Sequence, residues 1–366
     1  MKYRILLSIL FLAFICPAFS QQLLQRTDIE KIFSTYLADT SNTGLAVGII
    51  FGDSSKVYCF GRQKKSDTVK ISPSTIFEIG SITKTFTAVL LAESVLQNKM
   101  SLEDPIDKYL PDSVKLLPDM QNKIKLSNLI THTSGLPRIP DDFIKNTTYT
   151  GRNADLHFGE KELFDYLRNY KNSTPVGHFA FYSNLGVGLL GHLLELNSQK
   201  SYDSLVKDEI CKPLGMLHTK KYLSSIDSFY LAQGYAKGKA VYLYNFGVLS
   251  GACSLKSTIT DMLIYLDKNI NTSENQLSEA IEMTHRKLKR FDRKNNIGMA
   301  WFIRKHRFGG RTRWHNGSFN GQRSFIAFDA TKKLGVIILA NSTDDSTDSY
   351  GFQMIKLLEK YYRKKK

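Results

Sequence analysis

The chain has 366 residues, of which 42% are hydrophobic and 23% are charged, so it can bury a large core in one big domain or two lobes. Lysine and arginine outnumber acidic residues by 50 to 34, which gives a formal net charge of +16 at pH 7. The excess is dispersed, with its densest patches at residues 286–294 and 363–366, and we find no nucleic-acid-binding motif. These patches indicate solvated surface or, alternatively, attraction to anionic polymers or lipids of a cell envelope.

Residues 1–20 read as a secretory signal peptide and not as a structural helix. Lys2 and Arg4 precede an apolar run at residues 5–14, and small residues at the end of the segment provide a cleavage site. Cys16 leaves lipid attachment open as an alternative, although a bulky residue precedes it. Removing the signal lowers the net charge to +14 and leaves no stretch apolar enough to span a bilayer. We therefore expect a secreted or periplasmic protein without a transmembrane segment.

Three cysteines follow the signal: Cys59, Cys211 and Cys253. An odd number at wide spacing does not predict a disulfide framework, and we interpret Cys253 as a small buried hydrophobe. The chain has no His-Glu-x-x-His, no Cys-x-x-Cys and no cluster of histidines, so we expect no catalytic metal and no cofactor.

The first predicted elements lead to one apolar helix. Residues 23–37 show helical periodicity, and residues 44–51 and 57–60 are predicted as two strands joined by a turn. Residues 81–96 form a helix that is apolar on nearly all faces, which predicts that it is buried.

Beyond this helix, the middle of the chain is mainly helix and loop, and strands return near the end. Helices are predicted at residues 125–130, 160–170, 186–196, 202–210 and 350–362, with a tight turn at 131–137. Strands are predicted at residues 301–303, 313–315, 324–328 and 334–340, the last two forming a hairpin.

Strands at both ends with helices between them predict an α+β fold. We expect an antiparallel sheet flanked by terminal helices, and an inserted mainly helical lobe. A single catalytic domain is expected at residues 21–366, with the α/β lobe at about 21–96 and 286–366 and the helical lobe at about 97–285. A groove between such lobes is a natural ligand site.

The strongest chemical motif is Ser-x-x-Lys, at Ser81 and Lys84 on the first turn of the apolar helix. A serine there has a backbone N–H without a helical partner and the helix dipole behind it. Lys84 lies on the same face, where loss of solvation favours a neutral amine that can activate the serine. A second copy, Ser204 to Lys207, has charged neighbours that predict a partly solvated helix.

Tyr182-Ser183-Asn184 supplies the first expected partner, in a loop just before a helix. The Tyr182 phenol can shuttle protons beside a lysine, and Asn184 can bind a substrate amide or orient Lys84. A packed aromatic side chain is the alternative for Tyr182 alone.

The second partner is the segment from Trp314 to Ser318. Gly317 allows another backbone to approach closely, so the N–H of Ser318 could face that of Ser81 and form an oxyanion hole. His315 could donate to a substrate carboxylate. An ordinary Asn-Gly turn is the alternative.

The order of Ser81-x-x-Lys84, Tyr182-Ser183-Asn184 and His315-Asn316-Gly317 resembles the three motifs of the serine β-lactamase-like superfamily, which includes penicillin-binding proteins. The Tyr-x-Asn form, residues 129–137 and the Pro-Leu-Gly-Met run at 213–216 resemble one branch, that of class C β-lactamases, D-alanyl-D-alanine carboxypeptidases and related esterases. The resemblance covers about residues 42–342. In this family the segment around His132 is a structural turn, so we leave that residue out of the chemistry.

This resemblance implies a β-lactamase/transpeptidase-like fold and acyl transfer through a serine ester. Ser81 would attack an amide, ester or β-lactam carbonyl, while Lys84 and Tyr182 would pass its proton to the leaving group. Water would then release the acyl group. The substrate-binding residues would be Asn184, His315, Gly317 and Ser318.

One departure affects the expected substrate. His315 stands where class C β-lactamases usually carry lysine, and it resembles the carboxypeptidase branch more closely. We therefore expect first a secreted D-Ala-D-Ala carboxypeptidase or peptidase, second an esterase and third a class C-like β-lactamase. The small substrate would be a peptide, an ester or a β-lactam. A binding protein for peptides or wall fragments on a retired scaffold is the non-enzyme alternative, which the complete set Ser81, Lys84 and Tyr182 disfavours.

Overall fold

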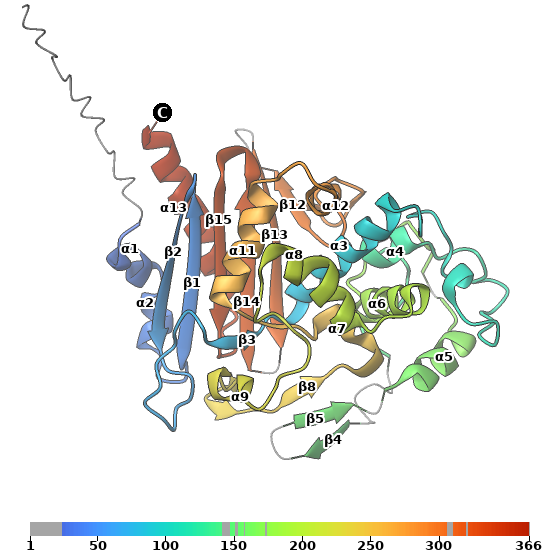
Figure 1. Cartoon of the computed structure of the whole chain (residues 1–366), viewed down its shortest axis with the longest axis horizontal. Helices are drawn as coiled ribbons and strands as arrows, with labels where there is room; N and C mark the ends of the chain where they lie inside the picture. The colour runs from blue at the N-terminus through green and yellow to red at the C-terminus, as the bar shows by residue number, and fades with distance from the viewer. Residues whose placement is uncertain are drawn as a thin grey trace, which may run out of the picture.

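A computed structural model describes residues 24–140, 147–150, 153–156, 158–172, 174–305, 310–319 and 321–365. Its centre is an eight-stranded antiparallel sheet in the order β10-β11-β12-β13-β14-β15-β1-β2 (Figure 1). The strands are β1 (Gly44–Phe51), β2 (Ser54–Gly61), β10 (Lys289–Arg290), β11 (Asn295–Ile297), β12 (Phe302–Lys305), β13 (Arg311–Phe319), β14 (Gln322–Asp329) and β15 (Leu334–Ala340). The predicted α+β fold is confirmed.

The sheet joins the two ends of the chain, because β1 pairs with both β2 and β15. In this register Val47 lies opposite Tyr58 on one side and Ile338 on the other. β1 is buried along its length apart from the partly buried Phe51 at its end. A continuous apolar run bounded by turns indicates a strand covered on both faces, and the structure shows this arrangement.

Helices cover the two faces of the sheet, and alternate residues of β1 point to each. Leu45 and Val47 belong to an apolar cluster with the terminal helices, whereas Ala46 and Ile50 belong to the larger core on the opposite face. The terminal helices are α1 (Arg26–Ile32), α2 (Ser34–Ala38) and α13 (Thr347–Lys365).

The opposite face packs against α11 (Ile259–Ile270), which contacts β1 and β15. This helix lies in the segment that the sequence assigned to the helical lobe, yet it covers the sheet. The division into lobes at about residues 97 and 285 therefore stays a prediction.

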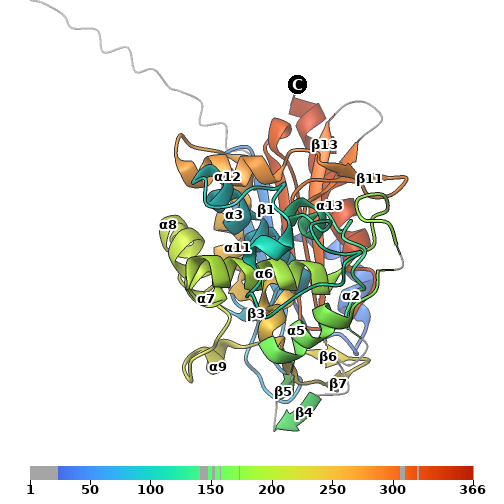
Figure 2. The same cartoon turned by 90° about the vertical axis from the view of Figure 1, so that its right-hand side faces the viewer.

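The helical layer is built around α3 (Thr83–Leu96), whose residues from Thr83 to Glu93 are all buried. α6 (Asn184–Ser198), α10 (Ser250–Cys253) and α12 (Gln276–Thr284) pack against it. Figure 2 shows α6 on the outer side of this layer, away from β1. The other helices are α4 (Leu126–Ile130), α5 (Glu160–Asn169), α7 (Tyr202–Leu205), α8 (Lys212–Leu214) and α9 (Asp227–Tyr230), with 3₁₀ turns η1 (Gly80–Ile82), η2 (Ile106–Tyr109), η4 (Gly247–Leu249) and η5 (Ala330–Lys332) and a π-helical turn η3 (Val206–Cys211).

Three small sheets complete the described fold. They pair β3 (Ile76–Glu78) with β9 (Lys256–Thr258), β4 (Thr147–Thr150) with β5 (Asn153–Leu156) and β8 (Leu243–Asn245), and β6 (Tyr235–Ala236) with β7 (Lys239–Ala240). The β3–β9 pair matters most, because β3 leads directly into η1 and α3.

The structure bears on the expected absence of a transmembrane segment, but not on the predicted signal peptide. Across the described ranges, we find no helix with the length and apolar character needed to cross a bilayer. The predicted signal peptide at residues 1–20 lies outside the described residues and stays a prediction.

Candidate active site

Ser81, the expected nucleophile, lies in η1 directly before α3. Gly80 adopts φ +51°, a left-handed conformation that glycine takes without strain, and so turns the chain from β3 into the helix. Ser81 is 8% exposed, and Lys84, one turn along, is completely buried. The Lys84 Nζ lies 3.0 Å from the Ser81 Oγ, so the fold brings both residues of the motif together.

Three oxygen atoms surround the Lys84 amine. Besides the Ser81 Oγ, the Nζ contacts the Asn184 Oδ1 at 2.7 Å and the Ala252 carbonyl oxygen at 2.8 Å. The amide and backbone oxygens can only accept, so they orient two N–H groups and leave the remaining direction of the nitrogen facing Ser81. A neutral amine held in this way can accept the serine proton, as a general base must.

Tyr182 reaches this group from the loop before α6. Ser183 caps that helix, because its Oγ accepts a hydrogen bond from the Gly186 N–H at 2.8 Å. Asn184 is the first residue of α6, and its side-chain oxygen accepts a hydrogen bond from the Lys84 amine. The centroid of the Tyr182 ring is 5.0 Å from the Lys84 Nζ, so the phenol ring and the amine are neighbours.

His132, which we expected to be only part of a turn, holds the Tyr182 loop in place. Its ring lies 4.4 Å from the Tyr182 ring, centroid to centroid. Its carbonyl oxygen accepts the Phe181 N–H at 2.8 Å, and its Nδ1 accepts the Ser183 N–H at 3.2 Å. Burial and the Lys84 charge keep the pKa of His132 well below its usual range, so the ring is neutral at pH 7. His132 therefore accepts hydrogen bonds from the residues on both sides of Tyr182.

The strand β13 passes beside η1. Its pairing with β12 extends only to Trp314, so residues 315–319 leave that edge free of β12 and close to the Ser81 turn. A Cβ on Gly317 would lie 2.2 Å from the Ile79 carbonyl oxygen, so only glycine permits this approach. The Asn-Gly pair is thus part of a strand and not a turn.

The close approach places a second backbone donor near Ser81. The Ser318 nitrogen is 3.3 Å from the position that a Cβ on Gly80 would take. Ser81 follows Gly80 directly, so the N–H groups of Ser81 and Ser318 come from two elements in contact. This arrangement fits the pair of donors that an oxyanion hole requires.

His315 is placed differently from the role expected of it. The side chain is completely buried, and its Nδ1 lies 2.7 Å from the Asn316 carbonyl oxygen. Because a carbonyl only accepts, Nδ1 carries the proton and Nε2 keeps a lone pair. Burial, with the Lys84 charge as a smaller cause, lowers the pKa of His315 to about 3. A buried neutral imidazole with its proton on Nδ1 has no N–H on Nε2 for a substrate carboxylate, so the expected substrate-binding role of His315 stays a prediction.

The second Ser-x-x-Lys copy lacks this environment. Ser204 lies in α7, where its Oγ accepts a hydrogen bond from the Ser201 hydroxyl at 2.9 Å. Lys207 is exposed. The structure therefore favours Ser81 over Ser204, as the surrounding sequence indicated.

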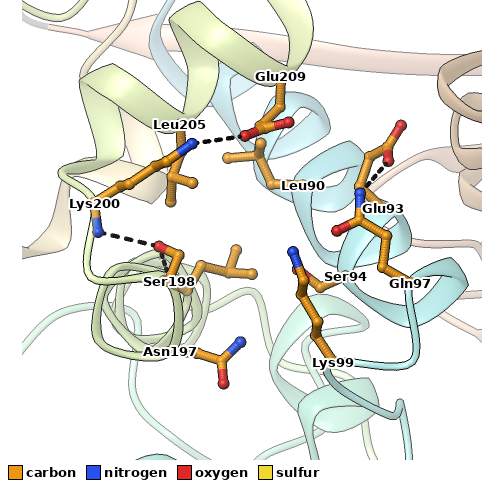
Figure 3. Close-up of a pocket in the computed structure, with 11 residues that line it drawn as sticks. Leu90, Glu93, Ser94, Gln97, Lys99, Asn197, Ser198, Lys200, Leu205 and Glu209 are labelled. Carbon is orange, nitrogen blue, oxygen red and sulfur yellow. Dashed lines mark hydrogen bonds and ion pairs between the residues drawn. The ribbon is translucent and has the colours of Figure 1, made fainter.

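A separate cavity of about 220 Å³ lies at the other end of α3. Figure 3 shows it between the second half of α3, the end of α6 and the turn η3, with Lys200 and Glu209 joined by an ion pair of 3.1 Å. Leu90 is the lining residue nearest to Ser81 along α3. At 1.5 Å per residue it is about 14 Å from Ser81 along the helix axis, so this cavity is not part of the Ser81 site.

Comparison with known proteins places these features in a family. A family model described as Beta-lactamase matches residues 29–358. The chain belongs to the beta-lactamase family. It is a serine hydrolase of that family, and the order of its three motifs agrees with this membership.

Relatives and solved structures support the same family and the same fold. A protein named Beta-lactamase from Providencia stuartii is 29% identical over 266 residues, which are 72% of this chain and 65% of that protein. Another of that name from Pseudomonas fluorescens is 28% identical and covers 86% of this chain and 94% of its own. A crystal structure of a class C beta-lactamase from Rhodobacter sphaeroides superposes with a TM-score of 0.78 over 90% of this chain and 99% of that one. At 24% identity, this last likeness shows a shared fold.

Proposed function

We propose that this protein is a class C-type β-lactamase that opens the β-lactam ring through an acyl-enzyme on Ser81. The observation that carries the proposal is the 3.0 Å contact between the Ser81 Oγ and the Lys84 Nζ, with Asn184 fixing the amine. The sequence ranked a D-Ala-D-Ala carboxypeptidase first. The relatives named beta-lactamase support the alternative, and we reverse that order.

The proposed reaction has two halves. Ser81 attacks the lactam carbonyl, and its proton moves to Lys84, while the N–H groups of Ser81 and Ser318 stabilise the negative oxygen. Tyr182 and Lys84 then deliver a proton to the leaving nitrogen, and the ring opens. Water attacks the resulting ester and frees the serine.

The state of His315 favours a second candidate, an esterase or peptidase. A neutral imidazole provides no positive charge at the position where class C β-lactamases usually carry lysine. A carboxylate-bearing substrate therefore loses one attraction there, and an uncharged ester does not. A panel of a chromogenic cephalosporin, a p-nitrophenyl ester and a D-Ala-D-Ala peptide compares these activities, and β-lactamase function requires the cephalosporin to have the highest kcat/KM.

Active-site labelling tests the nucleophile itself. A fluorophosphonate or fluorescent penicillin should label the wild-type protein and the Ser204→Ala variant, because Ser204 is outside the site. Ser81→Ala should not be labelled. Equal labelling of Ser81→Ala and wild type would show that the nucleophile is another residue.

Two proposals concern where the protein works. Export to the periplasm or the medium rests on the predicted signal peptide at residues 1–20. Attraction to anionic envelope polymers rests on the net positive charge alone.

A further inference from the structure

The side chain of Cys253 lies inside the catalytic cluster. Its Sγ is 3.3 Å from the Ser81 Oγ, 3.7 Å from the Lys84 Nζ and 3.9 Å from the Asn184 Oδ1. The residue is 4% exposed. The buried position agrees with the sequence interpretation, but the neighbours are the proposed reacting groups and not only hydrophobic side chains.

The fold fixes this thiol in place. Cys253 ends α10, which packs between α3 and α6. A Cβ on Gly251 would lie 2.9 Å from the Gly191 Cα, so α10 and α6 are in contact through these two glycines. The Gly251 carbonyl oxygen also accepts the Thr87 hydroxyl of α3 at 2.7 Å. The contact of Cys253 with Ser81 is therefore set by helix packing and not by a mobile side chain alone.

The hydrogen bonds around Lys84 leave the Ser81 hydroxyl in need of a second partner, which the Cys253 thiol can provide. Asn184 and Ala252 occupy two N–H groups of the amine in either protonation state. When Lys84 is an ammonium, its third N–H points to Ser81. The Ser81 proton must then turn to another acceptor, and among the described residues the Cys253 sulfur is in contact with Oγ and can accept it. When Lys84 is a neutral amine, Ser81 donates to it, and the S–H group of Cys253 can donate to the Ser81 oxygen.

We propose that Cys253 is a catalytic residue whose thiol is the second hydrogen-bond partner of the Ser81 Oγ. It keeps this oxygen directed at Lys84 in both protonation states. During attack the Ser81 proton goes to Lys84, the bond from Oγ to the acyl carbon forms, and the S–H bond of Cys253 stays intact. The S–H group offsets the partial negative charge that Oγ carries while its proton moves to Lys84, before the bond to the acyl carbon is complete. This inference rests on the proposed role of Ser81 as nucleophile.

The other two described cysteines lie on other elements, Cys59 on β2 and Cys211 in η3. Burial raises the pKa of Cys59 to about 11 and that of Cys211 to about 12, so both are protonated and weakly reactive at neutral pH. Cys59 lies on β2, on the far side of β1 from β13. Cys59→Ala is therefore a matched control, a thiol deletion outside the site.

The first experiment compares Cys253→Ala, Cys253→Ser and Cys59→Ala in the rate of fluorophosphonate labelling and in kcat and KM between pH 6 and 9. Loss of one neutral hydrogen bond of about 1.4 kcal/mol lowers the acylation rate about tenfold, so Cys253→Ala should lose kcat with little change in KM. Cys253→Ser, which keeps a hydroxyl donor and acceptor, should recover part of the rate, and Cys59→Ala should match wild type. A Cys253→Ala variant with the wild-type rate and pH profile would overturn the inference.

A second experiment uses the unmutated chain, so it does not depend on the folding of a variant. Methyl methanethiosulfonate converts the thiol to a methyl disulfide: a new S–S bond forms, the sulfur–sulfonyl bond breaks, and methanesulfinate leaves with the thiol proton released. We expect the added methylthio group to block labelling of Ser81 and dithiothreitol to restore it, while Cys253→Ser resists the reagent. Mass spectrometry shows whether Cys253 carries the methylthio group, and continued labelling of wild type that carries it, or equal inactivation of Cys253→Ser, would overturn the inference.

The failure of this inference is distinct from that of the proposed function. If the untreated wild-type protein is not labelled, Ser81 is not the nucleophile, and the inference about Cys253 is wrong as well. A labelled wild type with an unaffected Cys253→Ala removes only the role of the thiol.

Discussion

His132 and Tyr182 lie ring against ring at 4.4 Å, and His132 holds this position with a backbone φ of +59°. The left-handed region is costly for most residues with a Cβ, although asparagine and histidine enter it more readily than others. A strained residue that also bonds both neighbours of Tyr182 is a structural device for placing the phenol.

Substitution of His132 should separate its backbone role from its ring. Asparagine accepts the left-handed conformation and offers an acceptor oxygen to the Ser183 N–H, whereas alanine does neither. We expect His132→Asn to keep most of the stability and His132→Ala to lose about 1–3 kcal/mol in urea unfolding. Both variants should lose kcat, because both lose the ring that packs on Tyr182. Equal kcat in wild type and His132→Asn would show that the ring does not position Tyr182.

Replacement of Lys84 by methionine should abolish most of the acylation. Methionine fills a similar volume but provides no base, so kcat/KM should fall on the order of 10³-fold. Lys207→Met is the matched control, because that lysine belongs to the exposed second copy of the motif. Stopped-flow acylation and steady-state rates are measured for both variants. A larger loss of kcat/KM in Lys207→Met than in Lys84→Met would show that the second Ser-x-x-Lys copy is the catalytic one.

A methyl group on Gly317 should push β13 away from the Ser81 turn. The new Cβ meets the Ile79 carbonyl oxygen at 2.2 Å, which the backbone can relieve only by moving. We expect Gly317→Ala to lower kcat/KM about 100-fold, as for loss of an oxyanion donor, and to cost about 1–3 kcal/mol of stability.

Gly159→Ala is the control for that substitution. Gly159 has φ −91°, and a Cβ there would meet only the flexible Glu162 carboxylate at 3.2 Å. Its kcat/KM should stay at the wild-type value. Wild-type kinetics in Gly317→Ala would mean that β13 does not supply an oxyanion donor.

The buried histidines predict how stability depends on pH. Burial lowers the pKa of His132 and His285 well below the usual range and that of His315 to about 3. In the unfolded chain a histidine takes up a proton below about pH 6.5, so between about pH 6.5 and 3 the unfolded state binds more protons than the folded state. The free energy of unfolding should therefore fall as the pH falls below 6.5, by about 1.4 kcal/mol per pH unit for each such histidine, and should gain nothing from them above 6.5.

His285 offers a test of this slope away from Ser81. Its Nε2 bonds the Asn269 Oδ1 at 2.8 Å, and an amide donor can replace that contact. His285→Gln should show a shallower decline than wild type in urea unfolding at pH 7.5, 6.5 and 5.5. Parallel curves for the two proteins would contradict the assignment of His285 as a neutral buried group.

The sequence predicted the elements that have a strong local pattern. The apolar runs of β1 and β15 and the glycine break before α3 appear where they were expected. Strands of three residues, such as β3 and β9, are too short for an alternating pattern, and their pairing depends on contacts distant in sequence. The α11 helix carried a signal that a search with a period of 3.6 could have found, since Met262, Leu266 and Ile270 are buried at helical spacing.

The same division holds for the site. Ser81 with Lys84, and Tyr182 with Asn184, could be found because each pair belongs to a short motif within one local turn. The structure brings the side chains of Ser81, Lys84 and Asn184 together. Cys253 has no motif around it, because its role arises only from the packing of α10. The state of His315 depends on burial and on a tautomer, and neither can be read from its neighbours in the chain.

The pairing of β1 with β15 sets the order in which the site can be completed. Ser81 leaves the ribosome 237 positions before Ser318, and β1 lacks its second neighbour until residue 334 has been made. An incomplete chain therefore exposes one unpaired edge of β1, which can pair with other chains. Its Ser81 also has no β13 strand beside it. The proposed oxyanion hole joins N–H groups 237 positions apart, so a chain cut short before β13 would keep the serine and lack the second donor.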